Sequence, residues 1–159
     1  MLQYGEYYVK SFIKKEIREQ LFYRKPLFLK ELRIATGERA GFTDITAEIR
    51  SVVGNSGVKD GLCVVFIPHT TAAVTINENA DPDVQKDILD FLNDRIPEHG
   101  SYRHAEGNSD AHIKSSLLGA SLNVIIKDAK LVLGTWQGIY FCEFDGPRER
   151  KVWVDVIGK

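Results

Sequence analysis

The end of the chain constrains the fold most, because strand-like segments follow one another there with no helix between them. Ser121 to Lys127 and Lys130 to Phe144 are predicted strands joined by a tight turn at Asp128 and Ala129, and Val152 to Ile157 is a last strand. Strands joined by a tight turn pair antiparallel, whereas parallel strands need a long crossover. The order of elements therefore indicates an α+β fold rather than a regular alternation of strands and helices.

Three earlier segments also carry strand patterns. Leu27 to Ile34 alternates apolar and charged side chains, which predicts a half-buried or edge strand. Gly61 to Pro68 is a continuous apolar run, which is typical of a strand covered on both faces. Ala73 to Asn77 is predicted as a further short strand.

Three helices are expected between these strands. Asp44 can cap a first helix, whose apolar positions recur at helical spacing and end near Gly57. Asp81 followed by Pro82 is a strong start for a second helix, because a capping carboxylate precedes proline at the first helical position. A third, short helix is predicted over residues 111–118.

The beginning of the chain has a different pattern. Residues 7–24 place apolar side chains at helical spacing with basic residues between them, which predicts an amphipathic helix ended by Pro26. The strand pattern begins only after this proline. We therefore expect an N-terminal amphipathic extension over residues 1–26 and a single domain over residues 27–159.

The composition limits the classes of partner. The net charge of −1 at pH 7 gives no overall field that would attract nucleic acid or an anionic membrane. No stretch approaches the length of a membrane span, and the first ten residues do not form a secretory signal. We expect a cytoplasmic protein that binds a small molecule, with no nucleic-acid partner and no membrane partner.

The two cysteines, Cys63 and Cys142, both lie inside apolar strand-like segments. In such a segment a cysteine behaves as a small hydrophobic side chain. We expect two reduced core thiols rather than a disulfide or a pair of metal ligands.

Three of the four histidines lie at the ends of predicted elements. His69 directly follows the apolar run, and His104 and His112 flank a Gly-Asn-Ser loop. Imidazole is the commonest metal ligand in proteins, and three protein ligands with one open position are usual for catalytic zinc. On a straight helix His104 and His112 would lie about 12 Å apart, so Gly107 and Asn108 must fold the chain back if both reach one ion. The alternative is separate hydrogen-bonded or surface histidines.

Carboxylates and amides gather between Asn77 and Asp83, where a strand passes into a helix. Asp81 suits the N-cap, and Asp83 offsets the positive end of the helix. Glu78 lies before the cap, so capping does not explain it. It could hold a divalent ion, orient a histidine or act as a general base.

Two positively charged side chains are candidates for binding phosphate. Lys114 lies with the hydroxyls of Ser115 and Ser116 near a helix start, where exposed backbone N–H groups suit an anion. Arg148 lies in a predicted turn and could also bind phosphate. The alternative for both is ordinary solvation at the surface.

Trp136 and Gln137 stand between Gly134 and Gly138, ahead of a strand-like run. Glycine lets the backbone adopt angles that are closed to other residues and lets other groups approach closely. The pattern favours a tryptophan ring presented to a ligand. The alternative is a ring that fills the core or a subunit contact.

Five of these segments follow one another in a recognisable order. They are His69–Ala73, Ile76–Asp83, His104 with Glu106 and Gly107, Ala111–Gly119 and Leu133–Ile139. In this order they resemble the YjbQ family, also called uncharacterised protein family 0047. The match covers about residues 28 to 157, and its Gly-Thr-Trp-Gln block is highly specific.

The resemblance implies an α+β fold with a mixed β-sandwich, and a homotrimer with sites near subunit boundaries. It also implies a pocket around His69, His104 and His112 that holds a divalent metal ion, either zinc or magnesium. This chain departs from the family in two places. Residues 1–26 lie outside the family's usual start, and the loop from Glu106 to His112 is shorter than in many members.

The resemblance further implies a secondary thiamine-phosphate synthase activity. We therefore expect a metal-dependent enzyme that acts on a phosphorylated small metabolite. The residues expected to take part in catalysis are His69, Glu78 and Asp81. Those expected to bind substrate are Thr70, Asn79, Lys114, Ser115, Trp136, Gln137 and Arg148.

Two other classes of protein would use the same groups. A metal-assisted hydrolase of phosphate esters would use a zinc-bound water as its nucleophile. A non-catalytic, ligand-binding or structural trimer would instead hold its ion in a closed sphere of four ligands. An open ligand position favours the enzyme.

Overall fold

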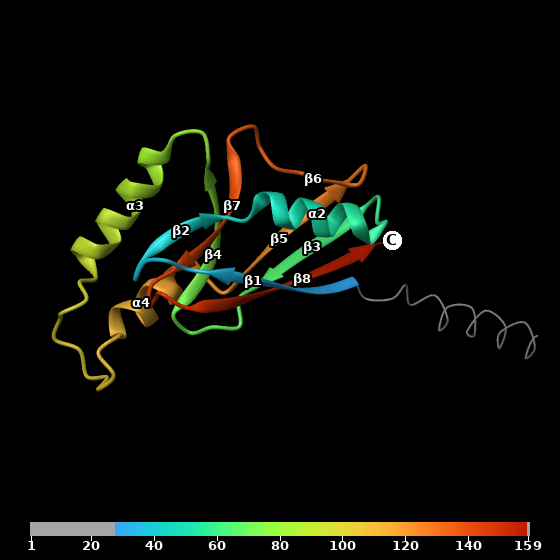
Figure 1. Cartoon of the computed structure of the whole chain (residues 1–159). Coiled ribbons are helices and arrows are strands. Elements are labelled where there is room, and N and C mark those ends of the chain that lie inside the picture. Colours follow the sequence, from blue (N-terminus) through green and yellow to red (C-terminus); the bar gives the residue numbers. More distant parts are fainter. Residues whose placement is uncertain (1–27, 159) are drawn as a thin grey trace, which may run out of the picture.

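Two antiparallel sheets form the framework of the computed structural model, which describes residues 28–158 (Figure 1). The larger sheet has the strand order β1-β8-β3-β5-β6. Its strands are β1 (Phe28–Ala35), β3 (Gly61–Phe66), β5 (Ser121–Lys127), β6 (Lys130–Leu131) and β8 (Glu149–Gly158). The smaller sheet has the order β2-β7-β4. Its strands are β2 (Gly41–Asp44), β4 (Ala72–Glu78) and β7 (Gln137–Glu143).

Three helices complete the described part of the chain: α2 (Thr46–Ser56), α3 (Pro82–Arg95) and α4 (Ser109–Leu118). A carboxylate of Asp44 accepts a hydrogen bond from the Thr46 N–H at 2.8 Å, and α2 ends at Gly57, whose φ is +71°. Asp81 accepts from the Asp83 N–H at 2.9 Å and so caps α3, with proline at the first helical position. The predicted cap of α3 at Asp81 is confirmed, and α2 ends at Gly57 as expected, but the N-cap residue of α2 is Ile45 and not Asp44.

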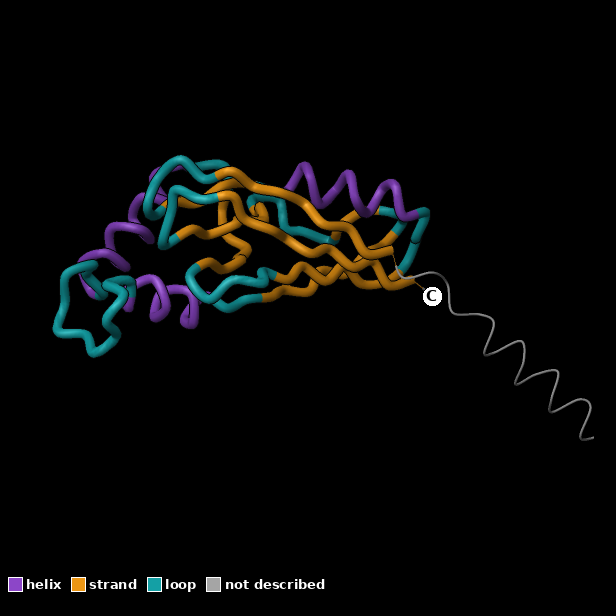
Figure 2. Tube along the Cα trace, turned by 60° about the horizontal axis from the view of Figure 1, so that its bottom comes forward, coloured by secondary structure: helices purple, strands orange, loops and turns teal. Residues whose placement is uncertain are grey.

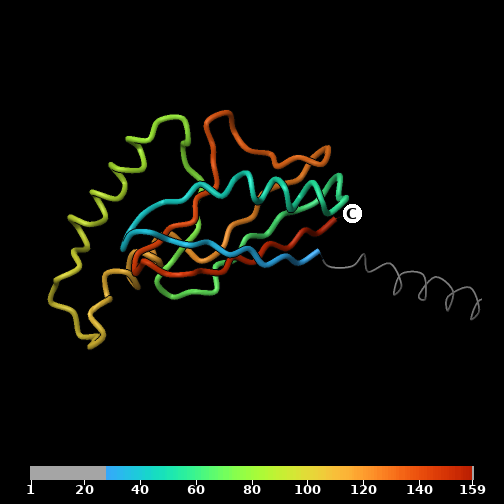
Figure 3. Tube along the Cα trace, in the orientation of Figure 1, coloured from blue at the N-terminus to red at the C-terminus, as the bar shows by residue number. Residues whose placement is uncertain are grey.

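The larger sheet, helix α2 and the smaller sheet enclose one core. One face of the five-stranded sheet packs against α2 and against the smaller sheet (Figures 1, 2 and 3). The other face of the smaller sheet packs against α3 and α4 in a second core. The buried residues of this second core are Ala73, Leu92, Ala111, Tyr140, Cys142 and Phe144.

The predicted α+β domain is confirmed, and so is the reduced, buried state of Cys63 and Cys142. Two strand predictions were wrong. The predicted strand from Lys130 to Phe144 is interrupted between β6 and β7, because the Gly134 loop leaves the sheet. The apolar run at β3 is covered on one face only, since Cys63 and Val65 are buried but Phe66 is 45% exposed.

The predicted amphipathic helix over residues 7–24 lies outside the described residues. None of the helices between residues 28 and 158 is long and apolar enough to cross a membrane.

Candidate functional site

His69 follows strand β3 and contacts the start of β8. Its Nε2 accepts a hydrogen bond from the Lys151 N–H at 2.9 Å. Burial, and after it the positive charge of Arg150, lower the pKa of His69 below its ordinary value of 6.5. A neutral imidazole has one acceptor nitrogen and one N–H, so Nδ1 carries the proton in this arrangement. His69 is therefore a hydrogen-bond donor toward whatever lies beside Nδ1.

A buried ion pair lies beneath His69. The Arg150 guanidinium donates to both carboxylate oxygens of Glu143, at 2.6 and 2.7 Å, and to the Thr71 hydroxyl at 2.9 Å. Thr36 also donates to Glu143, at 3.0 Å. Through Thr71 this network ties the segment that follows His69 to β8, and both charged side chains are buried.

The sequence carries a signal for the buried arginine of this pair. Arg150 lies in phase with Val152, Val154 and Val156, so strand alternation places it on the buried face of β8. A charged residue on a buried face needs a partner of opposite charge. Glu143 lies on another strand, however, and strand alternation alone does not identify it.

His104 and His112 lie together. Their ring centroids are 5.4 Å apart in an edge-to-face arrangement, and His104 Nε2 is 3.6 Å from a carboxylate oxygen of Glu106. Gly107, at φ +77°, reverses the chain between them, as the spacing required. Within residues 28–158, however, no three His, Cys, Asp or Glu side chains are placed to hold one metal ion. Of the three predicted metal ligands, a single chain therefore brings His104 and His112 together, and His69 does not lie with them.

Helix α4, which carries His112, is bound to the segment that follows His69. The Ser115 hydroxyl donates to the Thr70 carbonyl at 2.5 Å and thereby ties the helix to that segment. On the same side, Asn108 donates to the Asp145 carboxylate at 3.2 Å. We call this region, with His69, Thr70, His104, His112 and Arg148, the histidine end.

Arg148 is the exposed cation of the histidine end. Its guanidinium donates to the carbonyl and to the carboxylate of Asp145, at 2.7 and 2.9 Å, and about half of the side chain is exposed. The guanidinium nitrogen that these bonds do not use is free to meet an anion.

Lys114 is buried and hydrogen-bonded within the chain. Its side chain is 1% exposed, and the ammonium group donates to Asp110 at 3.0 Å and to Asn93 at 2.8 Å. Arg39 reaches the same carboxylate of Asp110 through two bonds of 3.0 Å. The predicted phosphate ligand Lys114 thus joins α3 to α4 in the single chain.

The tryptophan lies at the far end of the smaller sheet. Trp136 is 63% exposed, and its carbonyl accepts from the Asn79 N–H at 2.9 Å. Gln137 closes the loop, because its side chain accepts from the Gly134 N–H at 2.8 Å. Gly138 is required here, since a Cβ atom would lie 2.9 Å from the Asn79 side chain. The ring is therefore presented at the surface by a loop that is held on both sides.

Glu78 and Asp81 belong with this tryptophan. Glu78 pairs with Gln137 across β4 and β7, and Asp81 caps α3. We call this region, with Glu78, Asn79, Asp81, Trp136 and Gln137, the tryptophan end.

The two ends lie at opposite ends of β4. Thr71 precedes the first residue of the strand and Glu78 is its last, so about 24 Å separates these two residues at about 3.4 Å per residue. No hydrogen bond between residues 28 and 158 joins Glu78 or Asp81 to a histidine. The residues predicted to form one site are thus divided into two groups within a single chain.

Comparisons with known proteins agree with the motifs. A family described as UPF0047 protein YjbQ-like matches residues 30–159. A UPF0047 protein of Methanocaldococcus jannaschii is 56% identical over 130 residues, which span 82% of this chain and 94% of that protein. The UPF0047 protein YugU of Bacillus subtilis is 51% identical over 131 residues, 82% of this chain and 99% of that protein.

Solved structures show the same fold. A YjbQ/UPF0047 family protein of Clostridium acetobutylicum superposes with a TM-score of 0.80 at 58% identity, covering 80% of this chain and 99% of that one. A YbjQ-like protein of unknown function from Sulfolobus solfataricus gives a TM-score of 0.81 at 33% identity, covering 84% and 98%.

Proposed function

Because this chain belongs to the YjbQ family, we propose that it is a metal-dependent enzyme acting on a phosphorylated small metabolite, with its site formed where two copies of the chain meet. The observation that supports this most directly is the division of the site residues between the two ends of β4. The histidine end offers groups for an anion, and the tryptophan end offers an aromatic ring. Neither end alone provides for both parts of such a metabolite.

A homotrimer would bring the two ends together. In a three-fold assembly each contact is heterologous, which means that one surface of a copy meets a different surface of the next. The histidine end of one chain can therefore face the tryptophan end of its neighbour, and the assembly then has three equivalent sites. In a two-fold dimer the same surface meets itself, so the two ends would have to lie within one patch.

The residues of the histidine end suit phosphate. The Nδ1–H of His69 and the exposed guanidinium of Arg148 are donors, and the buried Glu143–Arg150 pair holds the backbone around His69 in place. Trp136 from the neighbouring copy would stack on a heteroaromatic ring, and Glu78 would act as a base or orient a donor.

The expected three-histidine ion site does not fit a single chain. We propose that His104 and His112 provide two imidazole ligands from one copy and that the boundary completes the ion's surroundings. Imidazole ligands favour zinc over magnesium, which prefers oxygen. The Nε2 of His69 is already an acceptor for Lys151, so His69 suits hydrogen bonding to phosphate better than ligation of the ion.

A secondary thiamine-phosphate synthase reaction is the specific activity we propose to test. The thiazole nitrogen forms a bond to the pyrimidine methylene carbon, the carbon–oxygen bond to diphosphate breaks, and pyrophosphate leaves with the electron pair. Donors at the histidine end would stabilise the charge on the leaving pyrophosphate.

Mixed trimers test the shared site. His69→Ala chains keep an intact tryptophan end, and Trp136→Ala chains keep an intact histidine end. Each variant alone should lack turnover of the pyrimidine diphosphate and thiazole phosphate in the presence of zinc. In an equal, random mixture roughly a quarter of the boundaries have both ends intact, so activity should recover to about that fraction.

Two results would contradict this proposal. A mixture that stays as inactive as its two components would place the whole site within one chain. An unfolded or dissociated His69→Ala protein would mean that His69 supports the fold or the assembly, and would contradict its proposed role as a donor to the substrate. Circular dichroism and melting curves of the single variants separate these results.

A further inference from the structure

A groove of about 520 Å³ lies between strand β1 and helix α2. Its apolar lining comes from Phe28 and Leu32 of the strand and from Val52 of the helix, and all three pack on the main core. Polar side chains line the rest of the groove: Lys30, Glu48, Ser51 and Asn55. The groove is thus an extension of the core that no residue between 28 and 158 fills.

The groove runs along an edge of the five-stranded sheet. Strand β1 pairs with β8 on one side and is the last strand of the sheet on the other. Helix α2 lies mainly over β6 and β8. The free edge of a sheet presents unpaired backbone N–H and C=O groups, and proteins commonly cover such an edge with a helix or a loop. A second helix beside α2 would fill the groove and cover this edge.

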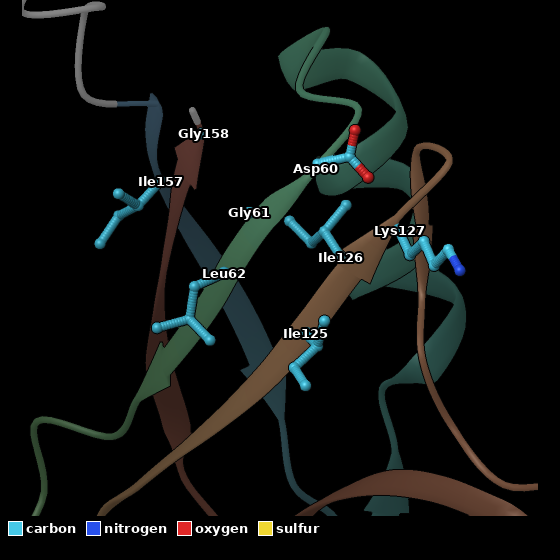
Figure 4. A pocket seen from close by; sticks show the side chains of 8 residues that line it. All are labelled: Asp60, Gly61, Leu62, Ile125, Ile126, Lys127, Ile157 and Gly158. Atoms are coloured by element: carbon cyan, nitrogen blue, oxygen red, sulfur yellow. The ribbon is translucent and has the colours of Figure 1, made fainter.

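A second cavity of the same sheet does not involve β1. It measures about 510 Å³ and lies along Leu62, Ile125 and Ile157 on three neighbouring strands (Figure 4). Strand alternation places these side chains on the face opposite to Cys63, which is buried in the core. Phe28 lines the groove and not this cavity, so the preceding chain is joined to the groove.

The sequence before Phe28 contains an element of the right kind. An amphipathic helix is predicted over residues 7–24, in which Val9, Ile13, Ile17 and Leu21 recur every four residues. These positions share one side of a helix. The sequence thus predicts an apolar surface for which the groove offers a matching lining.

The lengths of the two elements also match. A helix over residues 7–24 is about 27 Å long at 1.5 Å per residue. The eight residues of β1 span about 27 Å at 3.4 Å per residue. Residues 25–27 remain as the connection, within the range of about two to six residues that is usual between a helix and its strand. Pro26 in this connection does not continue a helix, which favours a turn there.

The charges favour the same occupant. Residues 1–27 contain six basic and three acidic side chains, whereas the rest of the chain contains fifteen basic and nineteen acidic ones. Glu48 lines the groove and is exposed. It suits a basic residue such as Lys14, which follows Ile13 at the margin of the apolar positions.

We propose that residues 7–24 form a helix that packs into this groove of the same chain, beside α2 and along β1. The family match begins at residue 30, so this helix would be a feature of this chain and not of the family's domain. The contact is independent of the enzymatic activity proposed above.

Alkylation of single introduced thiols in the full chain tests this contact. Cys63 and Cys142 are buried and do not compete for the reagent. Ser51→Cys places a thiol in the groove, and Arg50→Cys places one on the exposed, opposite flank of α2. The thiol of Ser51→Cys should react at least about tenfold more slowly than that of Arg50→Cys, because it reacts only when the covering helix detaches.

Variants in the N-terminal segment identify what covers the groove. Ile17→Lys places a charge among the apolar positions and should raise the rate of Ser51→Cys to that of Arg50→Cys. Ser11→Lys is the matched control, because it adds the same charge on the other side of the predicted helix and should leave the protection unchanged. Ile13→Lys repeats the disruption at a second apolar position.

Several results would overturn the proposal. Equal rates for Ser51→Cys and Arg50→Cys would show that the groove is open. Protection that persists with both Ile13→Lys and Ile17→Lys would show that another group covers it, and protection that falls on dilution would assign the cover to a second copy of the chain. If Ile17→Lys instead exposes an Ile125→Cys thiol, the segment lies on the opposite face of the sheet.

Discussion

At the scale of single residues, the Glu143–Arg150 pair is a buried ion pair whose carboxylate needs several hydrogen-bond partners. Both side chains are buried, and burial alone would raise the pKa of Glu143. The bonds from Arg150, from the Asp145 N–H and from Thr36 outweigh burial and hold that pKa below the ordinary value of 4.5. The carboxylate therefore depends on partners from β8 and from the loop after β1.

Removing the buried cation should destabilise the fold strongly. Arg150→Met leaves Glu143 without its main partner, and breaking a buried pair from one side costs about 3 to 5 kcal/mol. Arg33→Met is the control, because its 2.8 Å pair with Glu149 is exposed and should cost less than about 1 kcal/mol. Chemical denaturation of both variants gives the two free energies. Equal losses of unfolding free energy in the two variants would mean that burial does not determine how much the Glu143–Arg150 pair contributes to stability.

The same carboxylate should make the protein sensitive to acid. Since the folded pKa of Glu143 lies below its unfolded value, its stabilising contribution is complete above about pH 4.5 and is lost as the pH falls through the folded pKa. Glu143→Gln should be less stable than wild type at pH 7, and the gap should narrow as the pH falls below 4.5. A constant gap from pH 7 to pH 3 would contradict this titration.

At the scale of elements, the β5–β6 hairpin contains a strained turn. Asp128 and Ala129 connect Lys127 to Lys130, and both have positive φ values, 52° and 60°. Two-residue hairpins favour such turns, usually with Asn-Gly or Asp-Gly. Alanine at the second position adopts a left-handed conformation that glycine adopts without penalty.

Replacing this alanine should stabilise the hairpin. Ala129→Gly relieves the left-handed strain and keeps the backbone bond from residue 129 to the Lys59 carbonyl. We expect a gain of about 0.5 to 1 kcal/mol after the added freedom of the unfolded chain is taken into account. Thermal melting measures the gain, and Ala129→Val should shift the melting temperature in the opposite direction. A lower melting temperature for the glycine variant would refute the assignment of strain.

Most elements were predictable from local patterns, and the exceptions have physical causes. Helices α2 and α3 were found because Asp44, Gly57 and Asp81 interact locally with the helix ends. The short strand β2 was missed, because its four residues show little alternation and it forms by pairing with β7, almost a hundred residues later. Such long-range pairing leaves no local signal.

At the scale of the whole molecule, the sequence motifs identified the site residues but not their arrangement. His69 and Glu78 are only nine residues apart, yet an extended strand lies between them and carries them to opposite ends of the sheet. Motif order along the chain gives no information about that separation. The same limit applies to Lys114, whose burial depends on Asp110, Asn93 and Arg39 meeting in three dimensions.

The two buried cysteines can report separately on the opening of the two cores. Cys63 lies in the core beneath the larger sheet and Cys142 in the core beneath α3 and α4. Burial, with the charge of Asp155, raises the pKa of Cys63 to about 11, and burial raises that of Cys142 further. Neither thiol should react with an alkylating reagent at pH 8 until its own sheet opens. In the Cys63→Ser protein only Cys142 remains, and in the Cys142→Ser protein only Cys63 remains. The rate of alkylation of the remaining thiol, followed by mass spectrometry, therefore measures the opening of each sheet separately. Native-state labelling as fast as in denaturant would rule out such protection.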